Sequence, residues 1–312
     1  MQRSIAEGVV AAWIAIAAGA VAGEKPKSAV AAEPIARVAA ATLVERIRLD
    51  LGDVAGISGL TSAGDQTLWA VPERGRFLVP LRLFGSKLGL LRAPVPLEGV
   101  PAGLDTESIG WVEGDVFALG TESQVDRRQE DRVLLVRLEA GVARVFDAIP
   151  LPYEAFGVRP RANQGLEAIC VVGNRVVVGL ESVGDARGLR VARLFIADLR
   201  QRRWSPALLK LSTATGKLAA LECRAEQDGI LAIAIERHYG VAHLLRFHLQ
   251  TAPAAEPIVP EVVANLAAIV PGVPNMEGLA FGGPGEILIA IDNDTSGTSG
   301  PNEVLVIRVP GL

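Results

Sequence analysis

Acidic residues recur at a nearly fixed spacing along this chain of 312 residues. Glutamates open four short apolar segments: Glu107, Glu167, Glu222 and Glu277. A second acid ends the next apolar segment 14 or 15 residues later: Glu122, Glu181, Glu236 and Asp292. A fifth copy has serine at the first position and an acid at the second: Ser58 and Glu73. Carboxylates in such a pattern can bind a hard cation or act as general acids and bases.

The elements that must position these acids form an internal repeat. The five copies begin 49, 60, 55 and 55 residues apart, and each contains a third apolar segment after its second acid. Repeats of this length, each holding several short antiparallel strands, are typical of β-propellers. We therefore predict an all-β fold, a β-propeller of five four-stranded blades, with six blades as the alternative.

The last copy provides only three strands. An isolated segment near the start, Thr42–Leu49, alternates apolar and polar residues as a half-buried strand does. We predict that it supplies the missing outer strand and closes the last blade. The propeller is then a single domain over residues 42–312.

The first residues predict export. Arg3 precedes an apolar, alanine-rich run over Val9–Val21, which has about the length of a signal-peptide core. Residues 1–32 are interpreted as signal peptide and leader, so the protein is expected to be periplasmic or secreted. No membrane attachment is expected after cleavage.

Composition and charge argue against a nucleic-acid partner. Half of the residues are hydrophobic, which allows a large core, and the net charge is −4. This charge gives no electrostatic footprint for nucleic acid. The expected partner is a small-molecule or phosphorylated substrate, and the expected state is a monomer.

The two cysteines leave two alternatives. Cys170 follows its glutamate by three residues and Cys223 follows its own by one. Both offsets are odd, so in equivalent strands the side chains would point the same way. This favours two buried thiols over a disulfide, although an oxidising compartment would permit the bond.

In a propeller the first strand of each blade lines the central channel, so the four glutamates should converge there. Converging carboxylates repel one another unless they take up protons or bind a cation. Ligands that offer only oxygen favour calcium. The predicted metal ligands are Glu107, Glu167, Glu222, Glu277, Asp292 and Asp294. The alternative is a structural role, in which the same carboxylates accept backbone hydrogen bonds.

Two motifs resemble the N-x-G-x-E-G-[IL]-A hallmark of phytase-like esterase domains: Asn163–Ile169 and Asn275–Ala280. Asp105–Ile109 resembles the D-x-E-G-[IL] motif of the same family. The resemblance implies an exported propeller with phosphoesterase or esterase activity, often with calcium. It departs where Ser108, Ala168 and Cys223 replace the glycine after glutamate.

Other catalytic signatures are absent from the sequence, including a G-x-S-x-G elbow and a phosphate-binding P-loop. Two function classes therefore remain. The first is a metal-assisted ester hydrolase whose catalytic residues are Glu107, Glu167, Glu277, Asn163 and Asn275, the asparagines orienting ligand oxygens. The second is a non-catalytic propeller that binds a ligand or a protein.

Overall fold

The computed structural model describes residues 41–52, 54–64, 67–84, 87–123, 131–159, 162, 164–186, 188–227, 229–250, 256–293 and 300–312. The predicted signal peptide and leader lie outside these residues, as do Asn163 and Asp294. Ala36–Leu312 form one compact unit. In the part of the chain described, no helix is long and apolar enough to cross a membrane.

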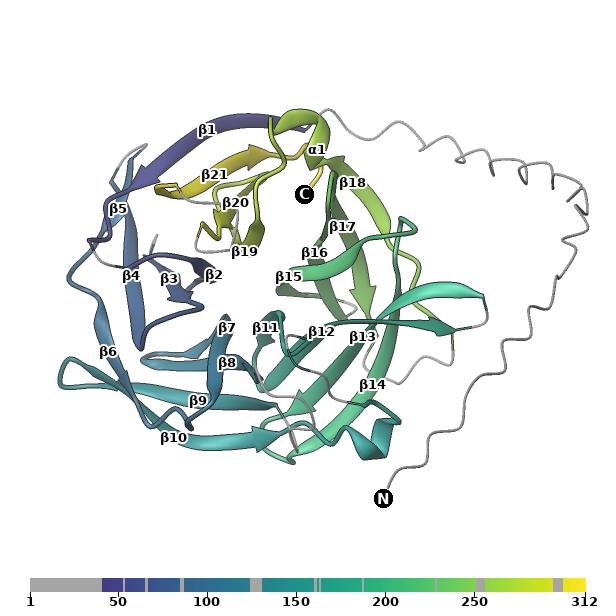
Figure 1. Cartoon of the computed structure of the whole chain (residues 1–312), viewed down its shortest axis with the longest axis horizontal. Helices are drawn as coiled ribbons and strands as arrows, with labels where there is room; N and C mark the ends of the chain where they lie inside the picture. Colours follow the sequence, from purple (N-terminus) through teal and green to yellow (C-terminus); the bar gives the residue numbers. More distant parts are fainter. Residues whose placement is uncertain are drawn as a thin grey trace, which may run out of the picture. The chain divides into compact units, whose positions relative to one another are not determined.

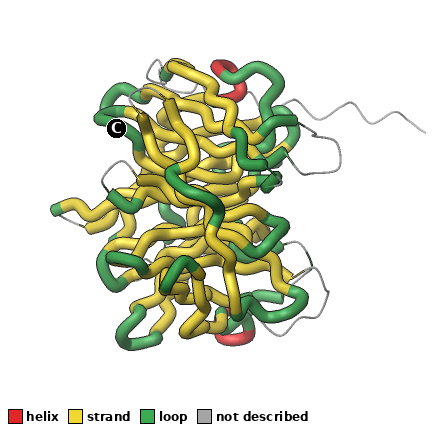
Figure 2. Tube along the Cα trace, turned by 90° about the vertical axis from the view of Figure 1, so that its left-hand side faces the viewer, coloured by secondary structure: helices red, strands yellow, loops and turns green. Residues whose placement is uncertain are grey.

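The compact unit is built almost entirely of β-sheet (Figure 2). Two four-stranded sheets follow the chain order. The first contains β11 (Ala168–Val172), β12 (Arg175–Ala186), β13 (Leu189–Asp198) and β14 (Arg203–Lys210). The second contains β15 (Lys217–Glu226), β16 (Gly229–His238), β17 (Val241–Leu249) and β18 (Glu261–Asn265). The helical segments are single turns, η1 (Glu154–Phe156) and α1 (Leu266–Ile269).

A third four-stranded sheet joins the two ends of the described chain. Its order is β1 (Thr42–Leu49), β21 (Asn302–Arg308), β20 (Glu286–Ile291) and β19 (Met276–Phe281). β1 pairs antiparallel with β21 from Thr42 opposite Arg308 to Leu49 opposite Asn302. The N-terminal strand is therefore the outer strand of the sheet that holds the last copy of the repeat.

The first two copies of the repeat form one continuous sheet of nine strands instead of two separate blades. Its strands are β2 (Ile57–Ser62), β3 (Thr67–Pro72), β4 (Phe77–Phe84), β5 (Lys87–Leu90), β6 (Val95–Glu98), β7 (Leu104–Glu113), β8 (Val116–Ser123), β9 (Arg132–Glu139) and β10 (Val142–Pro150). Two short strands, β5 and β6, pair with the two halves of β4 on its outer side. Pro94 and Pro96 have no N–H to donate, which keeps β6 short, and β6 also pairs in parallel with β10.

The innermost strands neighbour one another in a closed cycle: β2, β7, β11, β15 and β19 (Figure 1). Apolar side chains fill the space between each strand group and the next. In one such layer Trp69 and Leu78 pack near Phe117, and in another Ile233 packs near Ile289. The arrangement is an all-β, propeller-like fold, as the repeat predicts.

Small residues let the innermost strands approach closely. A Cβ atom added to Gly278 of β19 would lie 2.9 Å from Leu60 Cβ of β2. One added to Gly59 of β2 would lie 2.9 Å from Ser108 Cα of β7. The glycine after the repeated acid therefore has a packing role between neighbouring strands.

The two cysteines form a disulfide, so the expectation of free thiols is wrong. Cys170 of β11 and Cys223 of β15 are joined with a Cα–Cα distance of 5.6 Å. The sequence argument failed because it treated Glu167 and Glu222 as equivalent. The true equivalent of Glu167 in β15 is Ala219, as the strand register described below shows. Cys170 lies three residues after Glu167, and Cys223 lies four residues after Ala219. Because one offset is odd and the other even, the two side chains point in opposite directions along the equivalent strands and face each other.

Candidate functional site

A β-bulge at the start of the innermost strands positions the first acid of the repeat. The register of β7 against β8 shifts between Thr106 and Ser108, which leaves Glu107 as the extra residue. The same shift isolates Glu277 in β19 and Ser58 in β2. A bulge bends its strand and re-aims the extra side chain. Glu107 and Glu277 are therefore set in the same local geometry, and Glu167 directly precedes the first residue of β11.

The bulge of β15 falls on a different residue from the one that the sequence pattern indicates. Its register shifts between Leu218 and Ala220, so Ala219 occupies the bulge. Glu222 lies three residues further along the strand, and Ala220 stands where Gly278 stands in the last copy. The structure therefore brings Glu107, Glu167 and Glu277 together and leaves Glu222 apart from them.

Burial raises the pKa of all three glutamates, and repulsion between carboxylates adds to this rise. Burial, followed by repulsion from Glu122, Glu73 and Glu277, raises the pKa of Glu107 well above its ordinary value. Burial also raises the pKa of Glu167, with further contributions from Glu107, Glu122 and Glu277. Carboxylates that repel one another in a poorly solvated place take up protons unless a cation offsets their charge.

Glu277 has a cation beside it and still titrates late. Burial raises its pKa to about 8, the attraction of Arg237 opposes this rise, and Asp292 and Glu73 add repulsion. Arg237 Nη2 lies 2.8 Å from Glu277 Oε1. Desolvation therefore outweighs one ion pair at this position.

In the second and the last copy the second acid stands at an equivalent position, one residue beyond the partner of the residue that precedes the bulge. Glu122 follows the residue that pairs with Thr106, and Asp292 follows the residue that pairs with Met276. By the same register, the residue at this position in the fourth copy is Arg237, because Leu218 pairs with Glu236.

Glu236, the second acid of the fourth copy in the sequence, lies one position before Arg237. The side chain is fully buried and accepts hydrogen bonds from the backbone N–H groups of Ser212 and Thr213, at 2.7 Å and 2.9 Å. The hydroxyl groups of the same two residues also donate to it. Glu236 therefore has a structural role.

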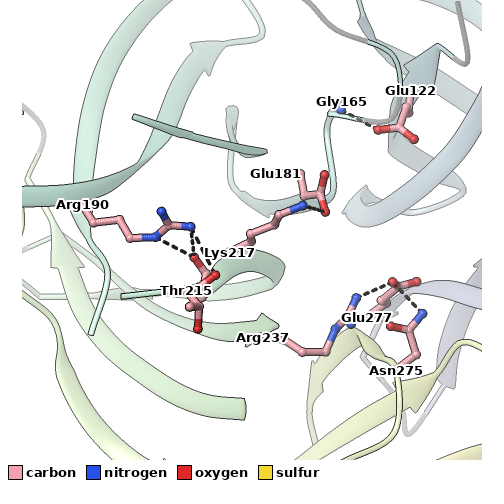
Figure 3. A network of polar contacts seen from close by, with 10 residues as sticks. Glu122, Gly165, Glu181, Arg190, Thr215, Lys217, Arg237, Asn275 and Glu277 are labelled. Atoms are coloured by element: carbon pink, nitrogen blue, oxygen red, sulfur yellow. Dashed lines mark hydrogen bonds and ion pairs between the residues drawn. The ribbon is translucent and has the colours of Figure 1, made fainter. Parts of the chain in front are cut away.

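The fourth copy thus adds two cations to the acidic end of the innermost strands (Figure 3). Lys217 Nζ lies 2.9 Å from Glu181 Oε1, and Arg237 pairs with Glu277. The Nε atom of Arg237 is buried without a hydrogen-bond partner in the described part of the chain. Sequence reasoning missed both residues. Only the strand register reveals Lys217, which precedes its bulge by two residues as Asn275 does.

Asn275 links the first and second acids of the last copy. Its amide Nδ2 donates to Glu277 Oε1 at 2.9 Å and to Asp292 Oδ2 at 2.7 Å. Between two copies, the backbone N–H of Gly165 in the third copy donates to Glu122 Oε1 of the second at 2.6 Å. The contact between Gly165 and Glu122 joins neighbouring strand groups, whereas the contacts of Asn275 fix the two acids within one group. We call the end of the innermost strands where the acids gather, defined by Glu107, Glu167, Glu277, Lys217 and Arg237, the acidic mouth.

The three glutamates of the acidic mouth suit a hard cation by their chemistry, since they offer oxygen atoms and their charges repel. Within the described residues, however, no group of three His, Cys, Asp or Glu side chains is arranged to hold a metal ion. Asn163 and Asp294, two further predicted site residues, lie outside this part of the chain. Cation binding at the mouth therefore stays a prediction.

The fold and the mouth define a class: an all-β, propeller-like protein with carboxylates gathered at one end of its innermost strands. The family model described as phytase-like, with the esterase-like activity of phytase, matches residues 52–295. The chain belongs to this phytase-like family. No curated protein matches the sequence.

Solved structures with a similar fold include sugar dehydrogenases. The PQQ-bound aldose sugar dehydrogenase of Streptomyces coelicolor has 11% identity and a TM-score of 0.48, over 86% of this chain and 98% of that one. A putative glucose dehydrogenase of Thermus thermophilus has 9% identity and a TM-score of 0.47, over 84% and 99%. A streptogramin B lyase has 10% identity and a TM-score of 0.40, over 86% and 98%. No activity is assigned to this chain from these likenesses.

Proposed function

We propose that the acidic mouth hydrolyses phosphate or carboxylate esters with the help of a bound cation, calcium being the best match to its oxygen donors. The observation that carries the proposal is the gathering of Glu107, Glu167 and Glu277, whose pKa values are all raised. A site that keeps carboxylates poorly solvated and mutually repelling is prepared for a positive charge. Membership of the phytase-like family supports the same reaction class.

Glu107, Glu167 and Glu277, with Asp292 beside them, would hold the ion. When bound, a divalent cation polarises an ester oxygen and increases the acidity of water. Asp294, for which the sequence makes the same prediction, would complete the donor set.

The side chains of the mouth have separate roles in this proposal. Burial raises the pKa of Glu277 to about 8, and a bound cation would lower it again, so Glu277 would serve as a ligand in its ionised form. Lys217 and Arg237 attract an anionic substrate by their positive charge. Asn275 orients the carboxyl of Glu277, and Asn163 is proposed to orient a ligand oxygen.

A second candidate function is a non-catalytic propeller that binds a small molecule or a protein. The specific observation in its favour is that several repeated acids accept hydrogen bonds within the fold. Glu122 accepts from Gly165, and Glu236 accepts from Ser212 and Thr213. In this reading the acids stabilise the contacts between neighbouring strand groups.

Thermal melting with and without calcium separates the two functions. If the mouth binds calcium, a chelator lowers the melting temperature of the wild type, because a ligand of the native state stabilises it by mass action. The double variant Glu167→Gln, Glu277→Gln loses this response and also loses hydrolysis of 4-nitrophenyl phosphate and naphthyl acetate. A matched control is Glu286→Gln, which removes a carboxylate paired with Arg308 outside the mouth. A wild type that melts identically in calcium and in chelator would contradict the metal-assisted reaction.

We also propose a blade number, a location and an oligomeric state for the protein. Five strand groups of four, with β1 as the outer strand of the last, are supported by the closed cycle of innermost strands and by the pairing of β1 with β21. An exported, monomeric protein acting in the periplasm or outside the cell is supported by the apolar N-terminal run and agrees with the disulfide. Mass spectrometry of the mature protein from its host should find a first residue between 23 and 33.

A further inference from the structure

A cavity of about 270 Å³ lies at the opposite end of the innermost strands from the acidic mouth. Every innermost strand contributes to its lining, which includes Thr61 of β2, Trp111 of β7, Val172 of β11, Glu222 of β15 and Phe281 of β19. The acids of the mouth stand at the starts of the same strands. Ligand pockets are commonly concave, largely apolar and equipped with a few polar groups. This cavity is smaller than most such pockets, but its lining likewise combines apolar side chains with a few polar groups.

Glu222 is the buried polar group of the cavity. The residue is 7% exposed and accepts a hydrogen bond from the N–H of Cys223 at 2.9 Å. Ser62 N–H and the Thr61 hydroxyl also donate to it. No Arg, Lys or His in the described part of the chain forms an ion pair with it. A buried carboxyl without a counterion is costly to ionise, and burial accordingly raises its pKa to about 8.

The walls of the cavity are apolar and partly aromatic. Trp111 and Phe281 face it from β7 and β19, and Val172 lies between them in the ring of strands. Arg224 is the other ionisable side chain of the lining, since Cys223 is in the disulfide. Its guanidinium stacks 5.1 Å from the centre of the Phe281 ring and pairs with Glu226 at 3.6 Å. Arg224 therefore has partners of its own.

We propose that this cavity binds a small organic ammonium ion with an apolar body, whose charged nitrogen pairs with Glu222 and whose body packs against Trp111 and Phe281. The ammonium supplies the counterion that Glu222 lacks, and the indole of Trp111 attracts a cation at close range, whereas the ring of Phe281 already carries Arg224. The small volume selects a single ring or a short chain. The proposal is independent of the reaction at the acidic mouth, because Glu222 belongs to the other end of the strands.

Isothermal titration calorimetry tests the proposal on the full folded domain, with chelator present and at pH 8.5. The probes are 2-phenylethylammonium chloride and its neutral counterpart 2-phenylethanol. The wild type should bind the ammonium at one site and bind the alcohol at least tenfold more weakly. Glu222→Gln should lose ammonium binding. The matched control Glu113→Gln, which removes an exposed carboxylate at the same end of β7, should retain it.

Two further measurements keep the test decisive. Ammonium affinity should fall roughly tenfold or more between pH 8.5 and pH 6.5, because binding requires the ionised carboxyl. Trp111→Leu should weaken binding even if Glu222→Gln fails to fold. Equal binding of amine and alcohol, binding that survives in Glu222→Gln, or no ammonium binding to the wild type would each overturn the proposal.

Discussion

Glu277 shows how the environment of a single carboxyl sets its chemistry. It touches Arg237 at 2.8 Å and accepts from the Asn275 amide, yet its pKa is raised to about 8. The ion pair and the hydrogen bond favour the charged form, whereas burial and the repulsion of Asp292 and Glu73 disfavour it. The second influence prevails, so the mouth carries protons at a pH where exposed glutamates have lost theirs.

Stability should therefore fall as pH rises. A glutamate whose pKa is raised in the folded state binds more protons when folded than when unfolded between about pH 4.5 and pH 8. Over that window the free energy of unfolding decreases with pH, and above it the loss is complete. Urea unfolding in chelator from pH 5 to pH 8.5 should show a loss on the order of 2 kcal/mol or more.

The variant Glu277→Gln should flatten this dependence, because it removes one titrating group and part of the repulsion on its neighbours. Glu286→Gln, outside the mouth, should leave the slope unchanged. A wild type whose stability is constant or increases over the window would show that the glutamates are ionised in the folded protein.

The sequence was sufficient to predict that Glu107, Glu167 and Glu277 lie together. It was not sufficient to predict that Glu222 lies apart from them. Glu107, Glu167 and Glu277 share their spacing to a second acid, and the structure puts them together. Glu222 has the same spacing but lies three residues beyond the bulge at Ala219. A bulge depends on how two strands pair, and a pattern of residue types in one strand carries no direct sign of it. Arg237 was missed for the same reason.

At the scale of elements, close contact between innermost strands explains a small residue at the same place in each of them. Gly59, Ser108, Ala220 and Gly278 follow a bulge, and Ala168 is the first residue of β11. The sequence motif E-G in the last copy was interpreted as a family signature. Its physical basis is that β19 and β2 leave no space for a larger side chain.

The variant Gly278→Ala should therefore destabilise the fold. The added Cβ would lie 2.7 Å from Ala290 Cβ and 2.9 Å from Leu60 Cβ, which forces the strands apart. Overpacking of this kind costs about 1–3 kcal/mol. Gly300→Ala is the control, since nothing lies within 4 Å of its added atom. Equal urea midpoints for the two variants would contradict a tight contact between β19 and β2.

The disulfide between β11 and β15 should also contribute to stability. Its half-cystines are 53 residues apart, so the bond removes considerable freedom from the unfolded chain. The double variant Cys170→Ala, Cys223→Ala should lose about 2–4 kcal/mol in the free energy of unfolding. Reductant should lower the stability of the wild type to a similar level and leave the double variant unaffected. A wild type that is insensitive to reductant after full reduction of the bond would refute this contribution.

For the molecule as a whole, the repeat was the strongest sequence signal, and it correctly indicated an all-β, propeller-like fold. The last copy provides three strands, as predicted, and β1 lies beside them as the fourth. The division between the first two copies differs from the prediction, because β6 pairs with β4 and β10 together. That pairing depends on the path of a proline-containing edge segment, which periodicity does not determine.

The pairing of β1 with β21 connects the N-terminal strand of the described chain to its last sheet, and it should be essential to stability. Ile47 and Leu49 of β1 pack in the same apolar cluster as Val304 and Val306. Deleting residues 42–49 removes these contacts and leaves β21 with an unpaired edge. The expected result is a large drop in melting temperature, or loss of a cooperative transition, measured by circular dichroism.

Val44→Asp is the control within the same strand, because Val44 is 45% exposed and its change should be tolerated. If the deletion melted like the wild type, the last sheet would be stable without its outer strand, and the proposed closure of the ring by β1 would have to be abandoned.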